Sequence, residues 1–186
     1  MSENQTIKEL LEKAKQRDIE AAKEILRRIS DKMYFITRLF VADHEQARKV
    51  EQAGLKKVFA SLKEVTNPEW FECWAAEKVR KEAIAHVLPL EESTTNSNMY
   101  TEADEIPNYM AVLPETAEGK KYQVLEMMDK LSTGARAALA LHLYDGLSVE
   151  ESAKLLMSTP QSVMSWLTEA KDTLMSNGFN LGTLIV

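Results

Sequence analysis

The chain has 186 residues, a length that predicts either one large domain or two small ones. Hydrophobic residues make up 45% of it and charged residues 28%, which is ordinary for a folded globular protein. Its single cysteine, Cys73, excludes a disulfide framework and a cysteine-rich zinc site, and its net charge of −6 has the wrong sign for a protein that binds nucleic acid unaided.

The N-terminal residues predict a cytoplasmic protein. Residues 1–15 have neither the basic leader nor the apolar core of a secretory signal peptide. No apolar run in the chain approaches the roughly 18 residues of a membrane-spanning helix. We therefore expect no membrane insertion.

Residues 1–87 predict a compact bundle of four helices joined by short loops. Asp18 and Asp43 are expected to cap the second and third helices, since aspartate accepts from the free amides of a first turn. Asn67 followed by Pro68 predicts the start of the fourth, because proline fits the first helical position. The residues expected to face the core are Ile7, Leu10, Leu11, Ala14, Ala22, Ile25, Leu26, Ile29, Met33, Ile36 or Phe40, Phe71, Trp74, Ala75 and Val79.

The composition changes in residues 88–121. This stretch has three prolines, seven acidic residues against two lysines, and no sustained helical period. It predicts a flexible acidic linker between two helical domains.

The segment that follows predicts a helix-turn-helix. Gly146 supplies a left-handed residue after one helix, and Ser148 with Glu151 forms a capping box at the start of the next. Thr159 is a predicted N-cap for the last helix, with Pro160 at its first position. The residues expected to face the core on this last helix are Val163, Leu167, Ala170 and Leu174.

The opposite side of this last helix is mostly polar, which matches a recognition helix that enters the major groove of DNA. The competing interpretation is a capped helical hairpin of the kind found in many all-helical proteins. The residues expected on the outer face are Gln161, Ser162, Met164, Ser165, Thr168 and Glu169.

A longer pattern extends from Arg136 to Leu174. Its members are Arg136, Leu139, Leu141, Tyr144, Gly146, Leu147, Ser148, Glu151, Ala153, Leu156, Ser158, Val163, Ser165, Leu167, Ala170 and Leu174. This pattern resembles the promoter-binding C-terminal domain of bacterial RNA polymerase sigma factors of the extracytoplasmic-function group. The layout of the N-terminal bundle resembles the sigma domain that docks on the polymerase clamp and opens the promoter.

The resemblance implies an all-α protein with two bundles. Residues 1–87 would contact the clamp and the −10 promoter element, residues 88–121 would be the linker, and residues 122–186 would bind the −35 element. The implied partners are core RNA polymerase, promoter DNA and an anti-sigma factor, and the implied function is transcription initiation.

The resemblance also implies which side chains make these contacts. Polymerase contacts are expected from Gln52, Leu55 and Lys56 on the third helix. DNA contacts are expected from Arg136, Ser148, Gln161, Ser162, Ser165 and Lys171 in the C-terminal domain and from Lys78, Arg80 and Lys81 in the N-terminal one.

Two stretches depart from the family pattern. Where the family has an acidic pair on its clamp-binding helix, this chain has Arg48 and Lys49. Three usually basic positions of the recognition helix are Met164, Trp166 and Glu169. An exposed tryptophan and methionine favour a protein-binding face, since both are enriched at interface cores.

The sequence contains no recognisable catalytic set. His44, His86 and His142 are scattered over three elements, none at metal-ligand spacing. We therefore expect no enzyme, no cofactor and no small-molecule substrate. Two hypotheses remain: a transcription initiation factor, and a sigma-like interaction protein that has lost promoter recognition and binds a protein partner.

Overall fold

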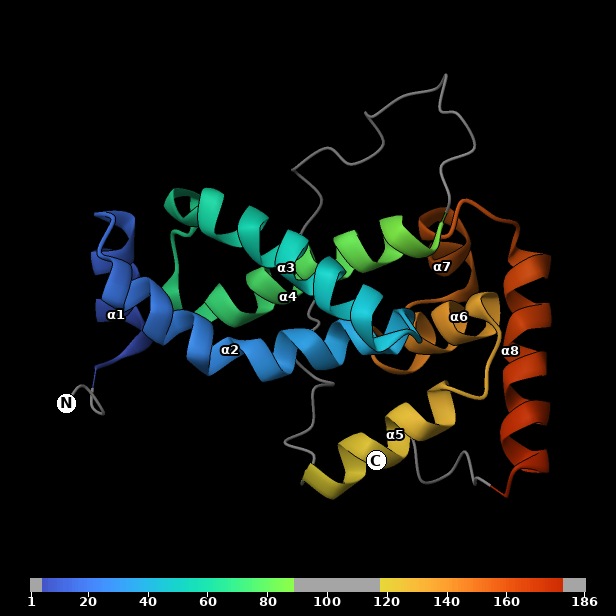
Figure 1. The fold of residues 1–186 in the computed structure, drawn as a ribbon. Coiled ribbons are helices and arrows are strands. Elements are labelled where there is room, and N and C mark those ends of the chain that lie inside the picture. The colour runs from blue at the N-terminus through green and yellow to red at the C-terminus, as the bar shows by residue number, and fades with distance from the viewer. Residues whose placement is uncertain (1–4, 89–117, 179–186) are drawn as a thin grey trace. The chain divides into compact units, whose positions relative to one another are not determined.

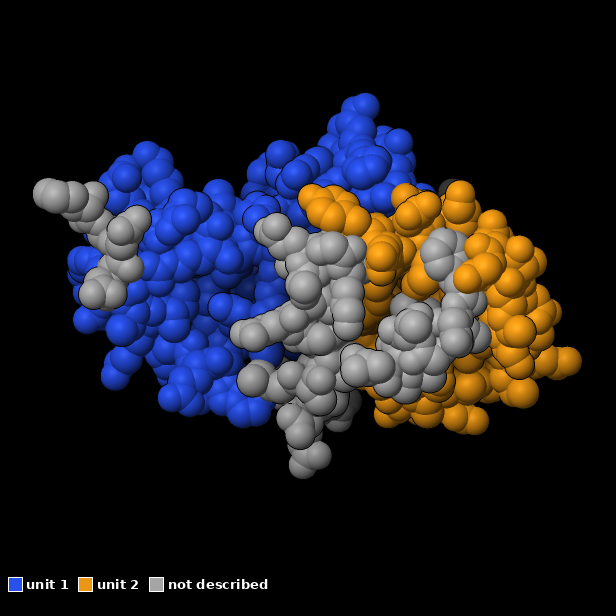
Figure 2. Space-filling view, turned by 90° about the horizontal axis from the view of Figure 1, so that it is seen from below, with its two compact units in different colours: residues 1–83 blue, residues 84–186 orange. Residues whose placement is uncertain are grey.

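The computed structural model describes residues 5–88 and 118–178 (Figure 1). These residues form α-helices, short 3₁₀ turns and loops, and no strand occurs among them. The expected all-α fold class is confirmed. The chain divides into two compact units, residues 1–83 and 84–186, which are coloured separately in Figure 2.

The N-terminal unit is a set of helices joined by tight turns. α2 packs against both α1 and α3, and α1 also meets the two 3₁₀ turns. The elements are α1 (Ile7–Lys15), α2 (Ile19–Phe40), α3 (His44–Ala60), the 3₁₀ turns η1 (Leu62–Glu64) and η2 (Pro68–Trp70), and α4 (Phe71–Val87), the end of which belongs to the second unit.

Polar caps fix where these helices begin. The Asp18 carboxylate accepts from the amides of Glu20 and Ala21 at 2.9 and 3.1 Å. Asp43 accepts from the Gln46 amide at 2.8 Å, so both caps are as the sequence predicts. Asn67 also acts as a cap, but it opens the 3₁₀ turn η2, and α4 begins only after that turn.

The core of the N-terminal unit largely follows the helical period. Of the residues expected there, Leu26 is exposed, and four are only half-buried: Ile7, Ala14, Ala22 and Trp74. Ala22 and Leu26 lie at the edge of the buried stripe of α2, which runs at four-residue spacing from Ala21 towards Met33. The buried apolar residues of this unit include Leu10, Leu11, Ala21, Ile25, Ile29, Met33, Ile36, Phe40, Val50, Leu55, Val58, Phe71, Ala75 and Val79.

The C-terminal unit contains the predicted helix-turn-helix. α6 packs against α7 and α8, and α7 packs against α8. The first residues of α5 fall within the range predicted as linker, most of which lies outside the described residues. The helices are α5 (Glu118–Met128), α6 (Thr133–Leu143), α7 (Val149–Leu155) and α8 (Pro160–Ser176).

Candidate functional site

The α7–α8 hairpin begins with a tightly hydrogen-bonded turn. Gly146 has φ 63°, and the Leu147 amide returns to the Leu141 carbonyl at 3.1 Å. The Ser148 amide donates to the Glu151 carboxylate at 2.8 Å, and the Glu151 amide donates to the Ser148 hydroxyl at 3.2 Å. These bonds lower the pKa of Glu151 and confirm the predicted capping box. Since the Ser148 hydroxyl is used in this cap, α7 is held at a fixed start.

The turn between α7 and α8 is short and locally strained. Met157 adopts φ 47°, a left-handed conformation that few residues other than glycine adopt, and its side chain is exposed. The Thr159 hydroxyl accepts from the Ser162 amide at 3.1 Å, and Pro160 occupies the first position of α8 as predicted. Both ends of this turn are thereby closed by local hydrogen bonds.

The outer face of α8 is the candidate site. Gln161, Ser165 and Lys171 are exposed, and Met164 is 60% exposed between them. Ser162 is half-buried, and its hydroxyl lies 2.9 Å from the Thr159 hydroxyl, so part of its hydrogen-bonding capacity is used in the cap. Thr168 and Glu169 are exposed, whereas Val163, Ala170 and Leu174 are buried as expected and Leu167 is half-buried.

Trp166 does not lie free on this face, contrary to expectation. It is half-buried, and its indole packs against Gly134 near the start of α6. A Cβ added at Gly134 would come within 2.5 Å of the ring, so only glycine fits beneath it without movement. The sequence could not reveal this, because the two residues are brought together by the α6–α8 contact. Of the two residues expected to form a protein-binding face, Trp166 and Met164, only Met164 is exposed.

We expect Gly134→Ala to destabilise the protein by about 1–2 kcal/mol. Overpacking against a rigid ring costs about 1–3 kcal/mol, and the better helix propensity of alanine offsets about 0.5–1 kcal/mol of that. Urea unfolding of the full chain measures the effect. In a Trp166→Leu background the same substitution should become neutral or stabilising, and a cost that persists there would show that the ring is not its cause.

Arg136 occupies the interior, which corrects its assignment to DNA. Its side chain is 1% exposed, and its Nη2 donates to Asp129 Oδ1 at 2.7 Å. A guanidinium held in this way cannot reach a phosphate while the helices stay packed. Its place in the sequence pattern therefore reflects packing of α6 against the end of α5.

The three cations expected to meet DNA from α4 are engaged within the N-terminal unit. Lys78 lies 3.3 Å from Glu64 and its Nζ is 4.6 Å from the centre of the Trp74 ring. Lys81 pairs with Glu77 at 2.7 Å, and Arg80 is buried. Phe71 is buried and Trp74 half-buried, with ring centres 6.2 Å apart, which indicates a packing role. The α4 surface is therefore a weaker candidate for phosphate contact than its sequence suggests.

Of the three residues expected to contact polymerase, two are exposed and one is buried. Gln52 and Lys56 are exposed on α3, whereas Leu55 is only 7% exposed and belongs to the core. Leu55 lies on the buried side of the helix, with Val58 three residues later. Truncating it would disturb folding as well as any contact, so it is no longer a useful probe of the surface.

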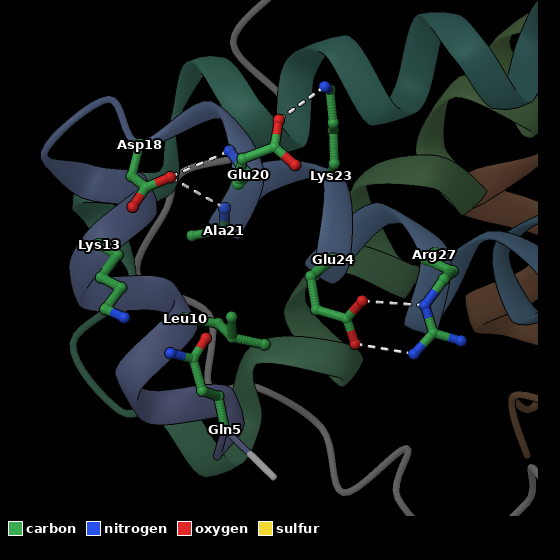
Figure 3. A pocket seen from close by; sticks show the side chains of 9 residues that line it. All are labelled: Gln5, Leu10, Lys13, Asp18, Glu20, Ala21, Lys23, Glu24 and Arg27. Carbon is green, nitrogen blue, oxygen red and sulfur yellow. Dashed lines mark hydrogen bonds and ion pairs between the residues drawn. The ribbon is translucent and has the colours of Figure 1, made fainter. Parts of the chain in front are cut away.

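A pocket opens between α1 and the first turns of α2 (Figure 3). Its charged residues largely pair with each other: Lys23 with Glu20 at 2.7 Å, and Arg27 with Glu24 at 2.8 Å. Hydrogen bonds from Arg27 and then Arg28 lower the pKa of Glu24 to about 2. With Asp18 committed to capping, this pocket presents no set of uncompensated charges to a ligand.

In residues 5–88 and 118–178, no group of three or more histidine, cysteine, aspartate or glutamate side chains is placed to hold a metal ion. None of the helices described is both long and apolar enough to cross a membrane.

Comparison with known proteins gives a family match for the C-terminal part of the chain. Residues 121–174 match the family model described as sigma-70, region 4. No curated protein matches the chain. One similar solved structure is that of CnrH in complex with the cytosolic domain of CnrY, with 17% identity and a TM-score of 0.39 over 90% of this chain and 93% of that one. At that TM-score the likeness supports no conclusion about fold or partner.

Proposed function

We propose that this chain is a transcription initiation factor of the sigma type, which binds core RNA polymerase through its N-terminal unit and promoter DNA through α8; the match of residues 121–174 to the model of sigma-70, region 4 supports this. The observation that carries the proposal is the doubly capped α7–α8 hairpin, which begins inside the region 4 match of residues 121–174 and leaves Gln161, Ser165 and Lys171 exposed. Glutamine and serine hydrogen-bond base edges, and lysine meets phosphate.

The net charge of the C-terminal domain explains why it needs core polymerase to bind DNA. Residues 122–186 carry 4 basic against 7 acidic residues, a net charge of −3. Since phosphate neutralisation supplies most non-specific affinity for DNA, this domain alone binds DNA poorly. Core polymerase provides the missing contacts and holds α8 at the promoter, in the cytoplasm where transcription takes place.

The proposed division of labour follows the family resemblance. Residues 1–87 serve the clamp and the −10 element, residues 88–121 connect the two domains, and residues 122–186 serve the −35 element. Gln52 and Lys56 remain candidates for the polymerase contact, and an anti-sigma factor that masks one of these surfaces is the expected regulator.

A specific observation favours a second candidate function. Met164 projects from the middle of the α8 outer face, where the family has a basic residue, and Glu169 lies exposed on the same helix. An apolar side chain offers phosphate no hydrogen bond, and a carboxylate repels it. Both can be accommodated by a protein surface. A sigma-like interaction protein would use this face for a protein partner.

Retention of the full chain on core polymerase, followed by transcription from a promoter library, tests the proposal. We expect retention and transcription from a subset of promoters. Gln161→Ala combined with Ser165→Ala should keep polymerase binding and lose about tenfold or more in discrimination among promoters, because each good base contact contributes about 1–3 kcal/mol. Retention without transcription from any promoter would favour the interaction protein.

A further inference from the structure

The first half of α8 presents a neutral strip to solvent. Gln161, Met164 and Thr168 are all exposed and are spaced by three and four residues, so they lie beside one another along one line of the helix. Met164, in the middle, is 60% exposed. We call these three residues the α8 strip.

Thr168 contributes a methyl group to this strip. Its hydroxyl donates to the Met164 carbonyl oxygen at 2.9 Å, one turn back along the same helix. A threonine hydroxyl bonded in this way is used within its own helix, and the methyl is the group left for contact with a ligand. Met164 and Thr168 together therefore form an apolar patch next to the side-chain amide of Gln161.

The charged residues of α8 lie away from the strip. Lys171 is seven residues, about 10 Å, beyond Met164 towards the end of the helix, and Asp172 is about 12 Å beyond it. Glu169 lies about 140° around the helix from Met164. Guanine is read in the major groove by arginine or lysine at its O6 and N7 atoms, and the strip offers it neither.

An A·T base pair matches the groups of the strip. Glutamine can form two hydrogen bonds to adenine, at N6 and N7, and apolar side chains contact the C5 methyl group of thymine, the apolar group that marks this base in the major groove. The residues of a recognition helix that contact base edges are those near its N-terminus. Gln161 is the second residue of α8, so the strip begins where such contacts are made.

We propose that Met164 and Thr168 contact thymine methyl groups, so that α8 selects a promoter element rich in A·T base pairs. The inference rests on the proposed function and deepens it, because it names the bases that α8 reads. It concerns a position at which this chain departs from the family pattern, which has a basic residue in place of Met164.

Replacing thymine by uracil tests the contact directly. Uracil pairs with adenine as thymine does, but it lacks the methyl group. The full chain in complex with core RNA polymerase is bound to a promoter duplex obtained from the library, and the thymines of its −35 element are replaced one at a time. We expect about fourfold weaker binding at one or two positions, the factor that corresponds to the burial of one methyl group.

Met164→Ala tests whether this side chain reads the methyl group. Met164 is exposed, so the fold should persist. The variant should bind the thymine duplex about fourfold more weakly and lose nothing further on uracil at the same position, because the two changes remove one contact. Met164→Leu keeps an apolar side chain and should retain the sensitivity to uracil. Met164→Lys is not suitable, because its charge raises affinity for DNA of any sequence.

Two further variants complete the test. Thr168→Ser removes the methyl group and keeps the hydroxyl that bonds to the Met164 carbonyl, so it should abolish the sensitivity to uracil at the second position. The matched control is Met175→Ala, which truncates another methionine of α8 that is 59% exposed but lies eleven residues beyond Met164. This control should keep the full loss of affinity on uracil.

The outcomes separate the inference from the proposed function. Promoter binding that no uracil replacement weakens would overturn the inference alone. A loss on uracil that persists in full in Met164→Ala and Thr168→Ser would overturn it too, since another residue would then read the methyl group. If Met164→Ala weakened binding to core polymerase and left promoter selection unchanged, Met164 would belong to a protein interface, contrary to the inference. Failure of the wild-type complex to bind any promoter would contradict the proposed function and the inference together.

Discussion

Asp129→Ala is expected to destabilise the C-terminal unit by about 2–3 kcal/mol, because it leaves the interior guanidinium of Arg136 without this carboxylate. Breaking a fully buried pair by removing one partner costs about 3–5 kcal/mol. Asp129 is 40% exposed, so solvent already weakens the pair and the cost falls below that range. Hydrogen exchange at α6 and urea unfolding of the full chain measure the loss.

Replacing Arg136 as well should reverse most of the effect. Arg136→Met in the Asp129→Ala background removes the stranded charge and fills a similar volume, and such apolar replacements are often neutral or stabilising. Asp172→Ala, which removes an exposed carboxylate of α8, is the control and should change stability by less than about 0.5 kcal/mol. If Asp129→Ala were equally silent, the ion pair would have no structural role.

The helix boundaries were predictable because caps are local. Asp18, Asp43, Ser148 and Thr159 each bond to amides two or three residues ahead, so their function can be read from short stretches of sequence. The left-handed conformation of Gly146 was likewise predictable from the residues next to it in the sequence. These features position the α7–α8 hairpin, and the fold class followed from them together with the apolar period.

The candidate site was harder to predict, because burial of long polar side chains depends on tertiary contacts. Arg136 looks like a surface cation in the sequence, yet α6 is packed so closely that the side chain is internal. Trp166 occupies a position expected to face outward, but Gly134 on another helix opens a space for its ring. Leu55 is next to the exposed Lys56 in the sequence, yet it lies on the buried side of α3. For Trp166 the deciding neighbour, Gly134, is remote in sequence.

Arg48 and Lys49 are adjacent in the sequence but have different surroundings in the structure. In the sequence they form one basic pair that departs from the family pattern. In the structure Lys49 pairs with Glu45 on the surface, whereas Arg48 stacks on Tyr34 and supports a buried carboxylate. Adjacent residues of one charge therefore have different roles, because successive positions on a helix point 100° apart.

The recognition helix provides the other large expected effect. Met164→Lys changes the charge by +1 and Glu169→Arg changes it by +2, so the net charge of the outer face of α8 changes by +3. Both side chains are exposed, so the substitutions should leave the packing of Val163, Ala170 and Leu174 intact. If α8 faces DNA, the holoenzyme should bind promoter DNA about tenfold more tightly or better, since two new phosphate or base contacts become available.

Salt dependence distinguishes a true contact from a general gain in charge. Each phosphate neutralised steepens the slope of log K against log salt by about 0.9, so two contacts predict an increase of up to about 1.8. The matched control is Tyr122→Lys with Glu126→Arg, which makes the same +3 change at two exposed positions of α5. Long-range attraction alone would raise affinity equally in both variants.

The two hypotheses predict opposite results for this pair of substitutions. If Met164 is part of a protein-binding face, burying a lysine in its place costs affinity for the partner, because the charge loses its water without a designed counter-ion. Promoter binding and its salt slope would then match the control. The measurement is a salt titration of holoenzyme on promoter DNA for wild type, variant and control. A variant no tighter and no steeper than its control would remove α8 from the DNA interface, and the exposed Met164 would then mark the surface through which a sigma-like interaction protein binds its partner.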